Sequence, residues 1–228
     1  MPTAIVTGAS RGLGLALARS LAQAGWRIVI DARGAEVLEQ ARAELAERTE
    51  VVALAGDVSD RAHRNELVAA AGPTLDLLVN NASLLGPSPQ PPLADYPLDV
   101  LERVYAVNTI APLALVQLAL PLMAPGGRIV NVTSDAGVEP YEGWGGYGSS
   151  KAALDQLGAI LAAEHPELRV YTVDPGDMRT QMHQEAFPDE DISDRPLPEE
   201  SVPGLLSLIT GDLPSGRYRA SDLAAVTA

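Results

Sequence analysis

The sequence has 228 residues, of which 46% are hydrophobic and 20% are charged, and this composition is typical of folded globular domains and excludes disordered, collagen-like and coiled-coil chains. Its 30 acidic residues outnumber 16 basic residues, and the net charge of −14 argues against nucleic acid as a partner because such a surface repels phosphate groups. Cysteine is absent and the three histidines are scattered, so we expect neither disulfides nor a bound metal.

Short apolar runs with strand character recur along the chain, and the first of them begins almost at once. We expect no secretory signal peptide there, and a cytoplasmic location, because the start is not basic and no small-residue cleavage site follows. The runs predict seven strands, at residues 4–7, 27–30, 51–55, 75–79, 127–133, 169–173 and 216–220.

The segments between these runs have helical spacing, so strand and helix alternate. Alternation predicts parallel βαβ units, and strands that are hydrophobic throughout predict helices on both faces of the sheet. The predicted fold class is therefore α/β, with a single doubly wound Rossmann-type domain over residues 1–228. The apolar residues 110–125 are shorter than the roughly 20 residues of a membrane span, so we expect a buried or interfacial helix and no membrane partner.

Residues 177–203 interrupt the alternation, because they are rich in proline and acidic residues and have poor periodicity. A long irregular stretch inside a compact domain is often a binding loop. We predict a variable substrate-binding loop or lid, and a solvated acidic loop is the alternative.

A glycine-rich turn, TGASRGLG at residues 7–14, lies between the first predicted strand and the first predicted helix. Glycine at positions 8, 12 and 14 permits a tight turn, and the free N–H groups at the start of a helix attract phosphate. The turn indicates a nucleotide or dinucleotide ligand, and a merely structural turn is the alternative.

Tyr147 and Lys151 are four residues apart and share one helix face. An ammonium group beside a phenol favours the phenolate, which suits a general acid or base, although a solvent-facing pair has the same spacing. Ser134, residues 80–83 and residues 174–176 each follow a predicted strand. The carboxyl ends of parallel strands form one edge of a sheet, so we expect these groups and the glycine-rich turn to share one site.

Together these motifs resemble those of the short-chain dehydrogenase/reductase family over nearly the whole chain. TGASRGLG matches the family's TGxxxGxG loop, NNAS at residues 80–83 resembles its NNAG, and DPG at residues 174–176 resembles its PG turn. Ser134, Tyr147 and Lys151 match its Ser and YxxxK, and Asn108 matches the asparagine that completes its tetrad. The resemblance implies an NAD(P)-dependent enzyme that acts on the CH–OH group of its donors.

The resemblance also implies a role for each matching residue. Tyr147 is then the acid/base for hydride transfer between the nicotinamide and a carbonyl or secondary alcohol. Lys151 binds the nicotinamide ribose and lowers the pKa of Tyr147, Ser134 binds the substrate oxygen, and Asn108 positions a water that relays protons. The expected cofactor-binding residues are Gly8, Ser10, Arg11, Gly12, Leu13, Gly14, Arg33, Asp57, Val58, Asn80, Ala82, Tyr147, Lys151, Pro175, Gly176, Met178 and Thr180.

The end of the second predicted strand bears on the choice between NAD and NADP. An acidic residue there accepts from the ribose 2′-hydroxyl, whereas arginine binds a 2′-phosphate. By the resemblance, the NAD-selecting aspartate would fall at Ala32, Arg33 matches an arginine of NADP-preferring members, and Arg11 resembles their second basic contact. We expect NADP(H), and Asp31 leaves NAD open.

A carboxylate follows Ser134 directly. We favour an outward turn for Asp135, and selection of a polar or cationic substrate is the alternative. Tyr141 and Trp144 suggest a substrate wall, with ordinary loop packing as the alternative, and Met182, His183 and Phe187 fall in the stretch that matches the family's substrate lid.

The partner expected from these motifs is a small-molecule carbonyl or alcohol substrate. Helices at residues 110–123 and 152–163 match the pair through which many family members form homodimers or homotetramers. The alternative functions are an NAD-preferring dehydrogenase of the same family, a catalytically silent dinucleotide-binding regulator, and an epimerase or dehydratase that retains its cofactor.

Overall fold

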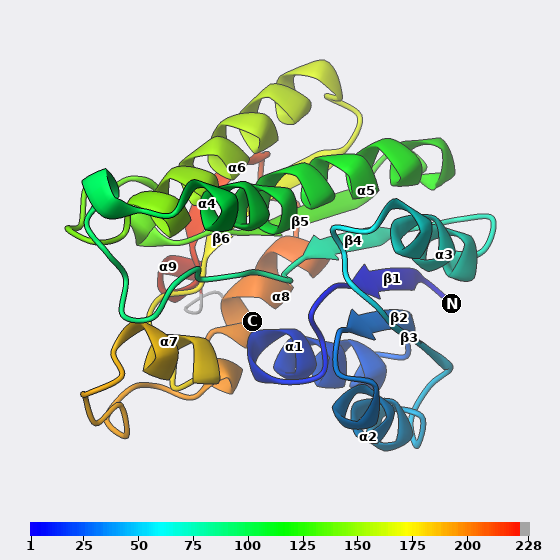
Figure 1. Cartoon of the computed structure of the whole chain (residues 1–228). Coiled ribbons are helices and arrows are strands. Elements are labelled where there is room, and N and C mark those ends of the chain that lie inside the picture. The colour runs from blue at the N-terminus through cyan, green and yellow to red at the C-terminus, as the bar shows by residue number, and fades with distance from the viewer. Residues whose placement is uncertain (224–228) are drawn as a thin grey trace.

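The computed structural model describes residues 1–223, and its centre is one parallel β-sheet with the strand order β3-β2-β1-β4-β5-β6-β7 (Figure 1). All seven predicted strands are present, and their ends differ from the predicted ends by no more than two residues. The strands are β1 (Thr3–Val6), β2 (Arg27–Ala32), β3 (Val51–Ala55), β4 (Leu77–Asn80), β5 (Arg128–Val132), β6 (Arg169–Asp174) and β7 (Gly216–Arg219).

The helices form a layer on each side of the sheet (Figure 1). Within residues 1–223 they are α1 (Gly12–Gln23), α2 (Ala35–Leu45), α3 (Arg61–Ala71), α4 (Leu98–Tyr105), α5 (Ala111–Ala119), α6 (Gly145–Glu164), α7 (Gln181–Ala186), α8 (Val202–Thr210) and α9 (Ala220–Leu223). Helices α1, α2 and α8 cover one face, and α3, α5 and α6 cover the other. The predicted doubly wound α/β fold is confirmed.

Neighbouring strand residues supply the two hydrophobic cores. Val6 and Ile30 pack toward α1, α2 and α8, whereas Ile5 and Val29, their neighbours in the chain, pack toward α3, α5 and α6. Side chains alternate across a strand, so a strand covered on both faces has to be apolar at every position. This burial explains why the strands read as continuous hydrophobic runs.

The chain leaves β1 in one direction to form β2 and β3, and then returns to the other side of β1 to form β4. Ligands bind in doubly wound sheets where the strand order reverses, outside the carboxyl ends of the strands. In this chain the reversal lies between β1 and β4, so the topology places the glycine-rich turn and the segment after β4 next to each other.

The apolar helix predicted at residues 110–123 is the second part of a longer helical run, Leu98–Leu122. Within the part of the chain that the structure describes, this run is long and apolar enough to span a membrane by length and composition alone, and half of its most apolar window is buried inside the protein. One π-turn, Ala106–Ile110, joins α4 to α5 inside the run. A π-turn of this kind often marks a functional position.

The stretch predicted to be an irregular loop, residues 177–203, is partly helical. It contains α7, a single 3₁₀ turn (Pro198–Glu200) and the start of α8. Its two ends are tied together, because the N–H of Arg179 donates to the carbonyl oxygen of Pro196 at 2.7 Å. The side chain of Thr180 caps α7 by accepting from the N–H of His183, a local signal that the proline and acidic content of the stretch obscured.

Candidate active site

A cleft of about 1080 Å³ runs along the carboxyl ends of the strands. The glycine-rich turn and the ends of β2 and β3 line one part of it. The segments after β4, β5 and β6, together with α6 and α7, line the rest. The motifs that the sequence places after separate strands therefore meet in one cavity, as the parallel topology requires.

The glycine-rich turn is held close to the segment after β4. Gly8 has a φ of +65° and a side chain there would lie 2.9 Å from the Cα of Ala82. A side chain at Gly14 would lie 2.5 Å from the carbonyl oxygen of Gly8. Both positions require glycine, because one has a left-handed backbone and the other has no space for a Cβ.

Helix α1 begins at Gly12 without a side-chain cap. The turn that precedes it lines the cleft with Ser10, Arg11, Gly12 and Leu13. Uncapped N–H groups at a helix start favour an anion, because they are unpaired donors at the positive end of the helix dipole. These residues fit the pyrophosphate of a dinucleotide.

Asp31 does not offer its carboxylate to the cleft as a free acceptor. One oxygen accepts from the N–H of Gly8 at 2.8 Å, and the other lies 3.0 Å from Nε2 of His63. Asp31 is almost fully buried. The arginines of the same region, Arg11 and Arg33, are exposed side chains that line the cleft. Each carboxylate oxygen of Asp31, which itself lies at the wall of the cleft, therefore already has one partner within the protein.

The tyrosine and lysine of the YxxxK motif lie on the inner face of α6, and both are buried. The Lys151 ammonium donates to the carbonyl oxygen of Val132 at 2.8 Å and lies 5.4 Å from the centroid of the Tyr147 ring. Ser134 follows β5, and its hydroxyl donates to Asp135 Oδ1 at 3.0 Å. Tyr147, Lys151 and Ser134 all line the cleft.

Burial controls the protonation of the two ionisable groups. It raises the pKa of the Tyr147 phenol well above the ordinary value, and the negative charges of Asp174 and Asp135 act in the same direction, while the Ser83 and Ser134 hydroxyls oppose it. Burial also lowers the pKa of Lys151 to about 8. We expected the lysine to lower the pKa of Tyr147, but burial has the largest influence on this pKa and raises it.

Three of the predicted site residues do not line the cleft. Asn80 is buried in β4 and its side chain donates to the side chain of Asn131 at 2.9 Å, so its predicted cofactor contact stays a prediction that the side chain does not support. Gly14 packs under the turn. Asn108 is fully buried behind Leu84. The cleft is lined by the other predicted residues, Gly8, Ser10, Arg11, Gly12, Leu13, Arg33, Asp57, Val58, Ala82, Ser134, Tyr147, Lys151, Pro175, Gly176, Met178 and Thr180.

Sequence reasoning overlooked two residues that shape the cleft. Asn81 donates to the carbonyl oxygen of Thr7 at 2.8 Å and thereby joins the segment after β4 to the glycine-rich turn. Ser83 lies at the cleft beside Tyr147 and donates to Asn108 Oδ1 at 3.2 Å. The signal for Ser83 was the serine at the last position of NNAS, where the family motif NNAG has glycine.

Asp135 faces the cleft, so the favoured outward orientation is wrong. Its carboxylate accepts from the N–H of Ala136 at 2.8 Å, as a turn residue would, and also from the hydroxyl of Tyr141 at 2.9 Å. It lines the cleft together with Ser134. One side chain therefore caps a turn and contributes negative charge to the site.

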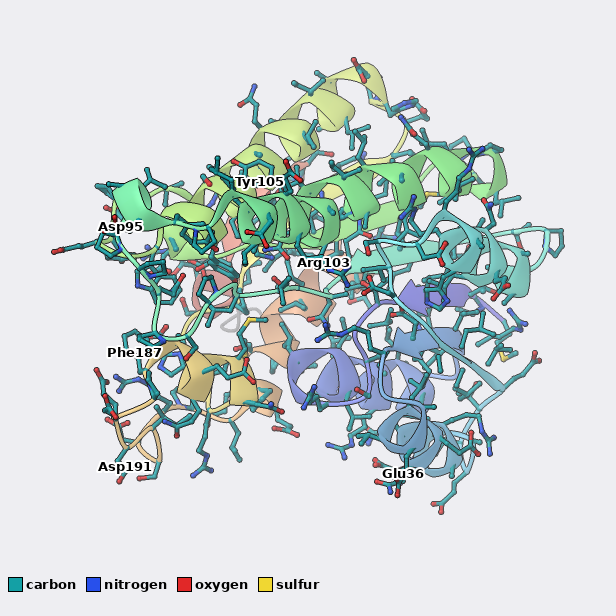
Figure 2. The ribbon with its side chains drawn as sticks, viewed as in Figure 1. Glu36, Asp95, Arg103, Tyr105, Phe187 and Asp191 are labelled. Carbon is teal, nitrogen blue, oxygen red and sulfur yellow. The ribbon has the colours of Figure 1, made fainter. Side chains whose placement is uncertain are left out.

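An aromatic cluster forms the wall next to Tyr147. The ring centroid of Trp144 lies 5.8 Å from that of Tyr147 and 5.8 Å from that of Phe187, and Tyr141 lies 6.4 Å from Trp144. Phe187 directly follows α7 (Figure 2). Its ring centroid is 5.0 Å from that of His183. The segment that contains α7 thus meets the loop before α6, and the rings pack in tilted and edge-on geometries.

Comparison with known proteins identifies the protein family. The short chain dehydrogenase family matches residues 2–191, and the chain belongs to that family of oxidoreductases. Among relatives, the uncharacterised oxidoreductase YciK of Escherichia coli is 32% identical over 218 residues, which cover 91% of this chain and 86% of YciK.

Two further relatives have named activities. A benzil reductase of Saccharomyces cerevisiae, described as (S)-benzoin forming, is 32% identical over 202 residues and the match covers 79% of this chain and 73% of that protein. Sepiapterin reductase of Mus musculus is 35% identical over 197 residues, with 79% and 76% covered.

Solved structures agree with the fold. A short chain dehydrogenase from Shigella flexneri in complex with NADP superposes with a TM-score of 0.89 at 29% identity, over 96% of this chain and 97% of that one. A short chain dehydrogenase from Escherichia coli in complex with NADPH gives 0.87 at 30% identity, over 96% of both chains.

Proposed function

We propose that the protein is an NADP-dependent oxidoreductase that transfers a hydride between nicotinamide and a carbonyl or secondary alcohol. The observation that carries this proposal is a single cleft that contains the uncapped start of α1, the buried Tyr147 and Lys151, and the half-buried Ser134. The cofactor supplies or accepts the hydride when it is bound. The side chains of the cleft then bind, orient and exchange the proton.

The charged residues of the cleft support NADP over NAD. Arg11 and Arg33 are exposed there, and Asp31 is occupied by Gly8 and His63. A guanidinium binds a 2′-phosphate through paired charge-assisted hydrogen bonds. The two solved relatives in complex with NADP and NADPH support the same choice. Asp57 and Val58 would contact the adenine, and Pro175, Gly176, Met178 and Thr180 would complete the nicotinamide end.

Tyr147 acts as the proton donor in reduction and the proton acceptor in oxidation. Its raised pKa keeps the phenol protonated at neutral pH, which is the form that reduction of a carbonyl requires. Ser134 turns its hydroxyl from Asp135 to the substrate oxygen. Lys151 binds the nicotinamide ribose. The Asn108 side chain holds the backbone of Leu84 beside the site and uses its whole amide in doing so, so a water that relays protons would meet the backbone of Asn108 and not its side chain.

The aromatic wall favours a substrate with a flat apolar group beside the reacting carbonyl. The ring of Trp144 lies in contact with the ring of Tyr147 on one side and with the ring of Phe187 on the other. Aromatic rings gain from edge and offset contacts with a second ring. In benzil, named as the substrate of one relative, each carbonyl is attached to such a group, and in sepiapterin, named for another, the side-chain carbonyl is attached to a ring that is flat but polar. Residues 177–203 would close over the substrate as a lid, within one domain that assembles as a homodimer or homotetramer.

A paired titration tests the cofactor, and a carbonyl panel then tests the reaction. The purified protein should bind NADPH more tightly than NADH and should oxidise NADPH fastest with aryl ketones. Tyr147→Phe should lose most turnover, on the order of a hundredfold or more, with little change in NADPH affinity. Tyr218→Phe is the matched control, because it removes a phenol whose hydroxyl donates to the carbonyl oxygen of Pro214, outside the cleft.

Three results would count against the proposal. Binding of neither cofactor would remove the function altogether. Binding of NADPH without its consumption by any carbonyl would favour a silent regulator or an enzyme that retains its cofactor. Equal turnover in the Tyr147→Phe variant would exclude this phenol as the acid/base.

A further inference from the structure

A buried acid and base pair joins two elements under the cofactor cleft. His63 of α3 and Asp31 of β2 approach to 3.0 Å between Nε2 and Oδ2, with side-chain exposures of 7% and 1%. Space for the imidazole is made by Gly56, where a Cβ would lie 2.3 Å from Nδ1 of His63. A histidine, an aspartate and a glycine therefore form one buried contact that involves no member of the Asn108, Ser134, Tyr147 and Lys151 tetrad.

The same carboxylate holds the glycine-rich turn. Its other oxygen accepts from the N–H of Gly8 at 2.8 Å, and the backbone carbonyl oxygen of Asp31 accepts from the N–H of Ala9 at 3.0 Å. His63 is thus connected to the phosphate-binding turn through one side chain. A buried carboxylate that keeps two partners is well satisfied, whereas one with a single partner is not.

The pair also sets the charge beneath the ribose end of the cleft. Asp31 lies two residues before Arg33, the residue that we propose for the 2′-phosphate. With a neutral imidazole the pair has a charge of −1, and with an imidazolium it has none. A nearby negative charge repels a 2′-phosphate but has little effect on a 2′-hydroxyl.

The groups around His63 favour its protonated form. Asp31 faces the ring from β2, and Asp60 and Glu66 lie on the capping turn and first turns of α3 itself. The hydrogen bond to Asp31 raises the pKa of His63 above its ordinary value, burial opposes the change, and the charges of Asp31, Glu66 and Asp60 add to it. The contact with Asp31 and the direction of the pKa shift therefore both favour the imidazolium form of His63.

We propose that His63 is a positioning residue that sets the cofactor preference of this protein, because its imidazolium neutralises Asp31 and holds it on Gly8 beneath the 2′-phosphate. The proposal rests on the proposed NADP-dependent function. The preference for NADPH over NADH then falls as pH rises and His63 loses its proton. Asp31 is the negative charge that this deprotonation exposes.

The test is a set of fluorescence titrations with NADPH and with NADH between pH 6 and pH 9. The readout is the ratio of the two dissociation constants, and it is compared between the unaltered protein and each variant because the 2′-phosphate itself also titrates. In the unaltered protein the preference for NADPH should fall roughly fivefold across this range relative to Asp31→Asn, which keeps an acceptor for Gly8 without the charge. His63→Gln should show the weaker preference already at pH 6, with no further loss.

His165→Gln is the matched control, because His165 pairs with Glu167 at the surface and belongs to no part of the cleft. It should follow the unaltered protein at every pH. If Asp31→Asn and the unaltered protein give the same dependence on pH, His63 has no role in cofactor preference, whether or not His63→Gln folds. Failure of NADPH to bind at any pH would overturn the proposed function instead, so the two failures are distinguishable.

Discussion

The side-chain amide of Asn108 bonds both backbone polar groups of Leu84. Its Oδ1 accepts from the Leu84 N–H at 2.8 Å, and its Nδ2 donates to the Leu84 carbonyl oxygen at 2.9 Å. The same amide donates to the hydroxyl of Ser150 at 3.0 Å, and that hydroxyl donates to the carbonyl oxygen of Tyr147 at 2.6 Å. Asn108 therefore joins the segment after β4 to the helix that contains the tyrosine and lysine.

Replacement of Asn108 by alanine should destabilise the protein and slow turnover together. It leaves the N–H and carbonyl of Leu84 without partners in a buried place, which costs about 1–3 kcal/mol of unfolding free energy. Urea unfolding measures the first effect and steady-state kinetics measures the second. Thr109→Val is the control, because Thr109 bonds the carbonyl oxygen of Ser150 and makes no contact with Leu84. An unchanged urea midpoint for Asn108→Ala would contradict this account.

Arg217 of β7 holds the backbone of Ser134 in place. Its guanidinium donates to the Ser134 carbonyl oxygen at 3.0 Å and to Asp155 Oδ2 at 3.0 Å. Arg217→Met should reduce kcat by roughly tenfold, because a loosely held Ser134 orients the substrate oxygen less well, and should leave NADPH affinity unchanged. Arg219→Met, two residues along the strand, removes an arginine that lies near Asp174 only. Equal losses of kcat in both variants would show that the lost positive charge, and not the hydrogen bond to Ser134, causes the effect.

The lowered pKa of Lys151 makes the stability of the cofactor-free protein depend on pH. The folded pKa is about 8, below the ordinary lysine value of 10.5, so between these two pH values the folded chain binds fewer protons than the unfolded chain. Stability therefore rises with pH across that interval. Above about pH 10 the raised pKa of Tyr147 acts in the opposite sense, because only the unfolded tyrosine ionises there.

The measurement is urea unfolding of the cofactor-free protein at pH 7, 8, 9 and 10, beside Lys151→Met. The unaltered protein should gain on the order of 2 kcal/mol relative to the variant between pH 7 and pH 10. A constant difference across this range would mean that the lysine titrates normally in the folded state.

Removal of the Asp135 charge should change the dependence of catalysis on pH. Asp135 raises the pKa of Tyr147, and Asp135→Asn keeps an acceptor for Ser134 and Ala136. For alcohol oxidation, which needs the phenolate, the acid limb of kcat/KM should move to lower pH by roughly half a pH unit. Glu139→Gln removes an exposed carboxylate from the same loop and should leave the limb in place. If the acid limb of kcat/KM does not move in Asp135→Asn, the Asp135 carboxylate does not influence the pKa of Tyr147.

Much of the fold was predictable because its signals are local. Apolar runs such as Val51–Ala55 and the helical spacing between them determine the order of elements, and a parallel sheet follows from that order. Element ends were less predictable. Residues 181–186 form α7 although their composition suggested a loop, since the helix depends on the Thr180 cap and on packing of Phe187 against Trp144.

The sequence by itself determined which chemical groups lie at the carboxyl edge of the sheet, because parallel strands leave each motif at that edge whatever the side chains do. Only the tertiary structure decided where those side chains point. Asn80 turns into the sheet to Asn131, Asp135 turns to the cleft, and Asp31 turns to Gly8 and His63. The direction of each side chain depends on partners that lie far away in the chain; Asp31 and His63, for example, are 32 residues apart. The spacing of residues in one sequence holds no information about which distant group will satisfy a buried polar atom.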